Sequence, residues 1–129
     1  MEDILESIGL TKSEVKVYLS LLDLGSSSVG SIIKSSKVAS SKVYELLDKL
    51  IEKGLVSVVI KKGIKYFEAA PPSRILDYLK EKDSELKDQI TNIKKILPEL
   101  ELKQKLSKEV SEISVYKSMN GIEMIGRYS

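Results

Sequence analysis

Residues 35–56 read SSKVASSKVYELLDKLIEKGLV, and this stretch decides the fold. Its second half carries one apolar stripe at helical spacing, made of Val43, Leu46, Leu47, Leu50 and Ile51. Gly54 suits the end of this helix, which we predict at residues 40–53. The residues that open the helix are short and polar, so its leading end is expected to face a partner rather than the protein core.

Three helices are predicted before this one. Thr11 and Glu14 have the spacing of a capping box, and Gly25 suits a helix C-terminus. These signals predict a helix at about 12–24, preceded by a short helix at 2–8. The serines that follow Gly25 supply an N-cap for a further short helix at about 28–35.

Two strand-like runs follow Gly54. Residues 55–60, LVSVVI, and residues 64–69, IKYFEA, are separated by the turn Lys61-Lys62-Gly63, which predicts a β-hairpin. A helix-turn-helix followed by a hairpin is a winged helix-turn-helix. The predicted fold class is therefore mainly α with a small β-hairpin wing, followed by a long coiled-coil helix.

The coiled-coil helix begins after Pro71-Pro72, where apolar residues recur every seven positions in two rows. We divide the chain into a winged helix-turn-helix domain at 1–72 and a helix at 73–112, which either dimerises, as we favour, or folds back on its own domain. Pro98 is expected to kink or break this helix. The predicted dimerisation residues are Leu79, Leu86, Ile90, Ile93, Leu97 and Leu100.

The last segment, residues 113–129, has the pattern of a strand, a turn at Asn120-Gly121 and the start of a helix. It is too short to form a core of its own. We expect either that it adds to another element or that the chain was cut from something longer.

Composition excludes most enzyme classes. The chain of 129 residues has no cysteine and no histidine, and its carboxylates do not form a calcium loop or a paired-acid site. It also has no nucleophile motif and no Gly-rich phosphate loop, so we expect no catalytic residues, metal or cofactor. The acidic N-terminus is unlike a signal peptide and no apolar run is long enough to cross a bilayer, so a cytoplasmic protein is expected.

Positive charge is concentrated in the part of the chain predicted to bind a partner. The net charge of the whole chain is +2. Residues 26–70 contain eight lysines and four acidic residues, a net charge of +4, whereas residues 73–112 contain nine basic and nine acidic residues. The predicted partner is double-stranded DNA, because helix 40–53 would enter the major groove with its N-terminal end leading.

Short side chains at that end let the backbone approach the bases, and lysines on the hairpin suit a wing on the flanking phosphates. Each residue also has a simpler explanation, since serines cap helices and lysines keep an edge strand soluble. Tyr44 either offers its hydroxyl to a phosphate or packs on the preceding short helix. The predicted DNA-binding residues are Ser28, Lys37, Ser40, Ser41, Lys42, Tyr44, Lys61, Lys62 and Lys65.

Three stretches carry a resemblance to a known family: GLTKSEVKVYLSLLDLG, SSKVYELLDKLIEKGLV and KYFEAAPPSRILDYL. They resemble the N-terminal domain of the TrmB-type archaeal transcriptional regulators over about residues 5–100. The resemblance implies operator binding by this domain, a homodimer formed by the long helix, and a separate C-terminal domain that senses an effector. ISVYKSMNGIEMI is similar to the first strand and turn of that sensor domain, so no small-molecule effector is expected for this chain.

The sequence departs from the family pattern at the turn before helix 40–53. The family often has glycine at the position of Lys37, and commonly Pro-Arg where this chain has Ala39-Ser40. Without that arginine, phosphate contacts and DNA shape are expected to carry more of the affinity. The function predicted is a dimeric DNA-binding transcriptional regulator; the alternative is a winged-helix module that binds other proteins.

Overall fold

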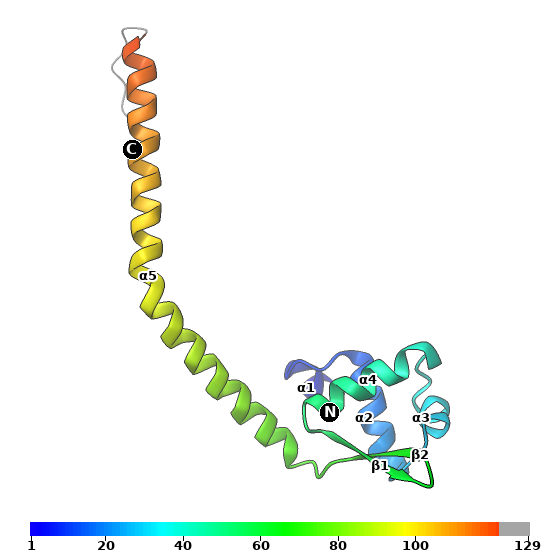
Figure 1. Cartoon of the computed structure of the whole chain (residues 1–129). Helices are drawn as coiled ribbons and strands as arrows, with labels where there is room; N and C mark the ends of the chain where they lie inside the picture. Colours follow the sequence, from blue (N-terminus) through cyan, green and yellow to red (C-terminus); the bar gives the residue numbers. More distant parts are fainter. Residues whose placement is uncertain (122–129) are drawn as a thin grey trace. The chain divides into compact units, whose positions relative to one another are not determined.

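The structure is a computed structural model that describes residues 1–121, with side chains as far as Ser111 (Figure 1). It confirms the fold class: a set of helices, a two-stranded antiparallel hairpin and a long C-terminal helix. The elements in chain order are α1 (Glu2–Ser7), α2 (Lys12–Leu24), α3 (Val29–Ser36), α4 (Ser40–Glu52), β1 (Val56–Lys61), β2 (Ile64–Ala69) and α5 (Arg74–Gly121).

The ends of α2 and α4 follow local signals in the sequence. The Glu14 amide donates to Thr11 Oγ1 (3.1 Å) and the Thr11 amide donates to Glu14 Oε1 (3.2 Å), which confirms the capping box. At the end of α4, Gly54 has φ +76° and its amide donates to the Ile51 carbonyl, while the Leu55 amide donates to the Leu50 carbonyl. This pair of bonds is a Schellman motif, which needs a residue that tolerates a left-handed backbone.

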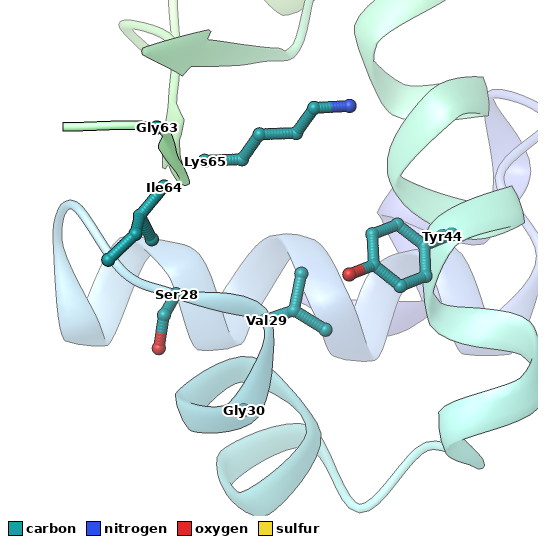
Figure 2. Close-up of a pocket in the computed structure, with 7 residues that line it drawn as sticks. All are labelled: Ser28, Val29, Gly30, Tyr44, Gly63, Ile64 and Lys65. Atoms are coloured by element: carbon teal, nitrogen blue, oxygen red, sulfur yellow. The ribbon is translucent and has the colours of Figure 1, made fainter. Parts of the chain in front are cut away.

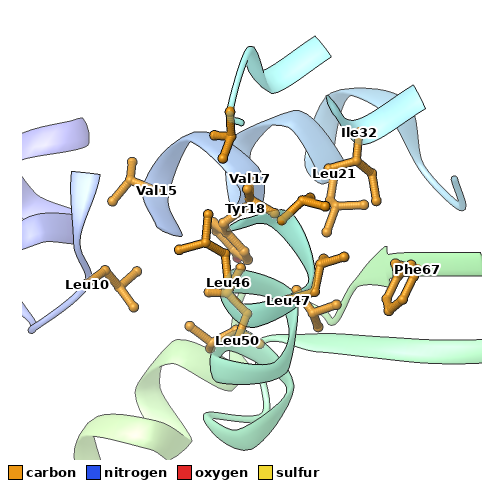
Figure 3. Packing of buried hydrophobic residues seen from close by; sticks show 14 residues of the cluster. Leu10, Val15, Val17, Tyr18, Leu21, Ile32, Leu46, Leu47, Leu50 and Phe67 are labelled. Carbon is orange, nitrogen blue, oxygen red and sulfur yellow. The ribbon is translucent and has the colours of Figure 1, made fainter. Parts of the chain in front are cut away.

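The core lies between α2, α3, α4 and the base of the hairpin (Figure 3). Its largest fully buried side chains include Tyr18 and Leu21 of α2 and Leu47 and Leu50 of α4. The predicted stripe of α4 faces inward, although Ile51 at its end is only half-buried. The opposite face of α4 therefore remains available to a partner.

The hairpin is fixed to the helices at its base. Phe67 of β2 is buried in the core, and its backbone pairs with that of Ser27 through two hydrogen bonds of 2.8 Å. Ser27 lies in the link between α2 and α3, so this bridge adds a short third segment beside β2. The base of the wing is thus fixed, while its far end is exposed.

A buried ion pair joins the beginning of α2 to the end of α4. Lys53 Nζ donates to Glu14 Oε2 at 2.6 Å, and the Glu14 side chain is 2% exposed. Burial raises the pKa of the Glu14 carboxyl, but the hydrogen bonds from Lys53 and Thr11 outweigh burial, so the pKa lies below its ordinary value of 4.5. Glu14 therefore caps the start of its own helix and also links α2 to the end of α4.

The chain divides into a unit of residues Met1–Asp83, here called the head, and a unit that begins at Ser84. The head extends beyond the boundary expected at residue 72, because Ile75 and Tyr78 of α5 pack against the core. Lys82 also belongs to the head: its Nζ donates to the Ile8 carbonyl at 2.9 Å and lies 5.1 Å from the centre of the Tyr78 ring.

The strand and turn expected over residues 113–121 are wrong, because α5 continues to Gly121. A strand there would need a partner for its backbone groups, whereas a helix satisfies them within its own turns. Residues 122–129, where the start of a helix was expected, lie outside the described residues. Pro98 lies inside α5 and does not break it. No helix in the described residues is long and apolar enough to span a membrane.

Replacing Glu14 by glutamine should lower the free energy of unfolding by about 2–4 kcal/mol near neutral pH, because the Lys53 ammonium loses its charged partner. The folded-state pKa of Glu14 is lowered, so its contribution is present above the unfolded-state value and disappears as the pH falls through the folded-state value. Urea unfolding at pH about 7 and about 3 should show the difference between wild type and E14Q shrinking in acid.

Glu45 provides the matched control, since it pairs with Lys49 on the surface of α4 at 3.3 Å. The Glu45→Gln variant should unfold nearly as the wild type does at both pH values. An E14Q protein as stable as wild type at neutral pH would contradict the structural role given to this carboxylate.

Candidate nucleic-acid interface

The leading end of α4 presents two serine hydroxyls that the fold does not use. The N-cap position is Ala39, which has no side chain able to cap, and Ser40 is the first helical residue. Within the described residues, no hydrogen bond engages the hydroxyl of Ser40 or Ser41. Both serines and Lys42 are exposed. The capping explanation for these serines therefore does not apply.

The turn between α3 and α4 is tight. Lys37 follows α3 with φ 60° and ψ 23°, a left-handed backbone, and its amide donates to the Ile33 carbonyl at 2.9 Å. The hydroxyl of Ser36, which is buried, accepts the Val38 amide at 3.3 Å. The turn is held from inside, so the exposed Lys37 side chain is left at the surface beside the start of α4.

The hairpin turns over the two residues Lys62 and Gly63, which have φ of 51° and 75°. Positive φ at both central residues defines a type I′ turn, which matches the twist of the two strands. Lys61, Lys62 and Lys65 are all exposed at this tip, and Lys61 Nζ lies 5.9 Å from the centre of the Tyr66 ring.

An open groove brings together the beginning of α3, the exposed face of α4 and the tip of the hairpin. Its volume is about 470 Å³, and Figure 2 shows the side chains around it. The Tyr44 ring projects from α4 into the space beside Val29, with its hydroxyl leading, and Lys65 extends from the hairpin toward α4. The lining residues are Ser28, Val29, Gly30, Tyr44, Gly63, Ile64 and Lys65.

The structure thus brings three of the predicted residues, Ser28, Tyr44 and Lys65, to one groove. Tyr44 is 56% exposed and lies beside Val29 of α3, so its hydroxyl is open to a partner while its ring adjoins the preceding short helix, and both interpretations of this residue stay open. The other predicted residues are exposed on the α3–α4 turn, the first turn of α4 and the hairpin tip. Figure 1 shows these segments on the same side of the head as α3.

Sequence reasoning missed the apolar part of the groove. Val29, Gly30 and Ile64 line it although none of them carries charge or a distinctive motif. Ile64 is 51% exposed at the first position of β2, where a solvated hairpin tip would favour a polar residue. An apolar residue at a hairpin tip otherwise rich in lysine was the available signal.

The predicted dimerisation residues lie on α5. Leu86, Ile90, Ile93, Leu97 and Leu100 are between 43% and 54% exposed, whereas Leu79 lies in the head and is half-buried. Beyond Pro98 the apolar residues change face: Leu102 is two positions after Leu100, about 200° around the helix. Leu106 and Val110 continue this second stripe at spacings of four.

Helices α2, α3 and α4, the hairpin wing and the basic leading end of α4 define the class of winged helix-turn-helix, DNA-binding proteins. Within that class the chain belongs to the TrmB family of transcriptional regulators. The family model described as sugar-specific transcriptional regulator TrmB matches residues 5–73, which is more than half of the chain.

A curated relative and two solved structures are similar to this chain. The HTH-type sugar sensing transcriptional regulator TrmBL1 of Pyrococcus furiosus is 32% identical over 96 residues, which are 74% of this chain and 27% of the relative. The chain therefore spans about a quarter of that protein's length.

The structure of TrmBL2, an archaeal chromatin protein, matches with a TM-score of 0.69 and 24% identity, over 82% of this chain and 42% of that one. A possible transcriptional regulator from Methanosarcina mazei matches with a TM-score of 0.54 and 21% identity, over 70% and 82% of the two chains. These two likenesses show the fold.

Replacing Tyr44 by phenylalanine should weaken binding to duplex DNA about fivefold, because the ring stays and a single hydroxyl hydrogen bond is lost. Fluorescence anisotropy with a labelled duplex measures the change. Tyr78→Phe is the matched control, since Tyr78 packs against the core at the start of α5 and does not line the groove. Equal affinities of Y44F and wild type for the duplex would show that the Tyr44 hydroxyl does not contact DNA.

Proposed function

We propose that this chain is a dimeric regulator of transcription that binds double-stranded DNA. The N-terminal end of α4 enters the major groove, and the hairpin lies on the flanking backbone. The observation that carries this proposal is the open groove in which α3, α4 and the hairpin tip meet, because it gathers exposed hydroxyl and ammonium groups from three elements.

The distribution of charge along α4 favours its leading end as the contact. Lys42 lies in the first turn, together with the positive end of the helix dipole. Glu45 and Asp48 lie further along the exposed face, where their carboxylates would repel phosphates. A duplex that met α4 along its whole length would bring these acids against the backbone, so an approach led by the N-terminal end is favoured.

The side chains available there read bases only weakly. Ser40 and Ser41 offer hydroxyls that either donate or accept, and Lys42 offers one flexible ammonium. No arginine, asparagine or glutamine lies on α4, and those are the side chains that read guanine or adenine through two bonds. Affinity should therefore depend chiefly on phosphate contacts and on the shape of the duplex.

The proposed dimer follows from the heptad stripe of α5. Leu86, Ile93 and Leu100 repeat every seven residues and are exposed in the single chain. A mostly charged helix with one apolar stripe gains stability when a second copy covers that stripe. Pairing would place two heads on one duplex, in keeping with half-sites about 34–36 Å apart.

Charge reversal of the wing tests DNA binding. The triple variant K61E/K62E/K65E should bind duplex DNA at least about 100-fold more weakly at 0.1 M salt, since three phosphate contacts per protomer become repulsive. Wild-type affinity should fall steeply as salt rises. The control is K12E/K16E/K80E, which changes net charge equally at exposed positions away from the groove. If both triple variants bind as wild type does, the wing is not a DNA contact.

Substitutions in the two stripes of α5 test the dimer. The variant L86E/I93E should sediment as a monomer and bind a two-half-site duplex more weakly, because the second head is no longer tethered. The matched control is L102E/L106E, which changes the stripe beyond Pro98 and should remain dimeric. If L102E/L106E were monomeric and L86E/I93E stayed dimeric, the dimer contact would not lie on the stripe of Leu86 and Ile93.

A further inference from the structure

Two lysines have a backbone conformation that their side chains disfavour. Lys37 (φ 60°) and Lys62 (φ 51°) are the non-glycine residues with positive φ in the described part of the chain. A left-handed backbone brings the Cβ atom of an L-residue too close to its own carbonyl, so such positions favour glycine or asparagine. The turn geometry alone therefore argues against lysine at both positions.

Neither lysine serves the fold through its side chain. Both are exposed, and among residues 1–111 no ion pair, hydrogen bond or ring contact engages either ammonium. Other lysines of the head do contribute to the fold: Lys53 pairs with Glu14, and Lys82 donates to the Ile8 carbonyl. Contacts within the described residues therefore give no reason for lysine at these two turns.

Both turns adjoin the proposed DNA-binding surface. Lys37 lies between α3 and Ala39, the N-cap of α4, and Lys62 directly precedes Gly63, which lines the groove. The two ammonium groups therefore border the surface at two separate turns. A duplex that reached the groove would bring its charged backbone to both.

We infer that Lys37 and Lys62 each neutralise one backbone phosphate of bound DNA, and that the chain keeps lysine at these turns against the preference of the fold. This inference rests on the proposed function and deepens it in two ways: it adds Lys37 to the phosphate contacts, and it states that lysine at both turns lowers the stability of the fold. It requires one unusual result: removing the charge must weaken DNA binding and stabilise the protein at once.

Asparagine is the informative replacement, because it is neutral and tolerates a left-handed backbone, and Asn-Gly is the preferred pair in a type I′ turn. K37N and K62N should each raise the melting temperature by about 4 °C. Each should weaken binding to a random-sequence duplex about eightfold at 0.1 M salt. The slope of log affinity against log salt should become shallower by about 0.9 for each protomer bound.

Two controls isolate the cause. K37R and K62R keep both the charge and the disfavoured backbone, so they should keep the wild-type slope and melting temperature. Lys16→Asn removes one charge from an exposed position on α2, away from the groove, and should leave the salt slope unchanged. A common effect of net charge would instead change the slope equally in K16N, K37N and K62N, and would overturn the inference.

The inference also fails if K37N and K62N are more stable yet keep the wild-type salt slope, since both lysines would then be ordinary turn residues. It fails equally if neither substitution raises the melting temperature. In both cases the proposed function still holds if the K61E/K62E/K65E variant binds duplex DNA much more weakly than the wild type does. If the wild-type protein binds no duplex at low salt, the proposed function falls and the inference falls with it.

Discussion

The carboxylate of Glu14 connects the two helices on which the proposed DNA-binding surface depends. One of its oxygens accepts the Thr11 amide at the start of α2, and the other accepts the Lys53 ammonium at the end of α4. Lys53 is the C-cap of α4 and lies three residues before the start of β1, so the ion pair holds the end of α4 close to where the hairpin begins. A carboxylate with both oxygens bonded is well suited to burial, because its charge is compensated.

In the head, the residues that stabilise the fold and the residues proposed to bind DNA lie on different parts of the same elements. The apolar stripe of α4 faces the core, and the base of the hairpin is held there by Phe67 and its bridge to Ser27. The first turn of α4 carries exposed serine hydroxyls, and the hairpin tip carries exposed ammonium groups. Lys37 and Lys62 show the same separation of binding from stability, because their left-handed backbone favours other residues than lysine.

Local patterns predicted much of the head, including the capping box, the stripe of α4 and the glycine that ends it. Contacts between distant residues were not predictable: Glu14 pairs with Lys53, and Ser27 with Phe67, across stretches that no local period links. The left-handed lysines were also missed, because lysine predicts no such backbone. The strand expected at 113–121 failed because alternating residues form a strand only beside a partner strand.

The central claim is that the start of α4, the start of α3 and the hairpin tip form one surface for duplex DNA. Backbone amide shifts recorded by NMR during titration with a short duplex at low salt test it most directly. The account predicts that the amide signals of three segments shift together and reach saturation at the same DNA concentration: Ser40–Tyr44, Ser28–Gly30 and Gly63–Lys65. The amide signal of Glu14 should not shift. Shifts confined to other faces of the head, with these three segments unchanged, would contradict it.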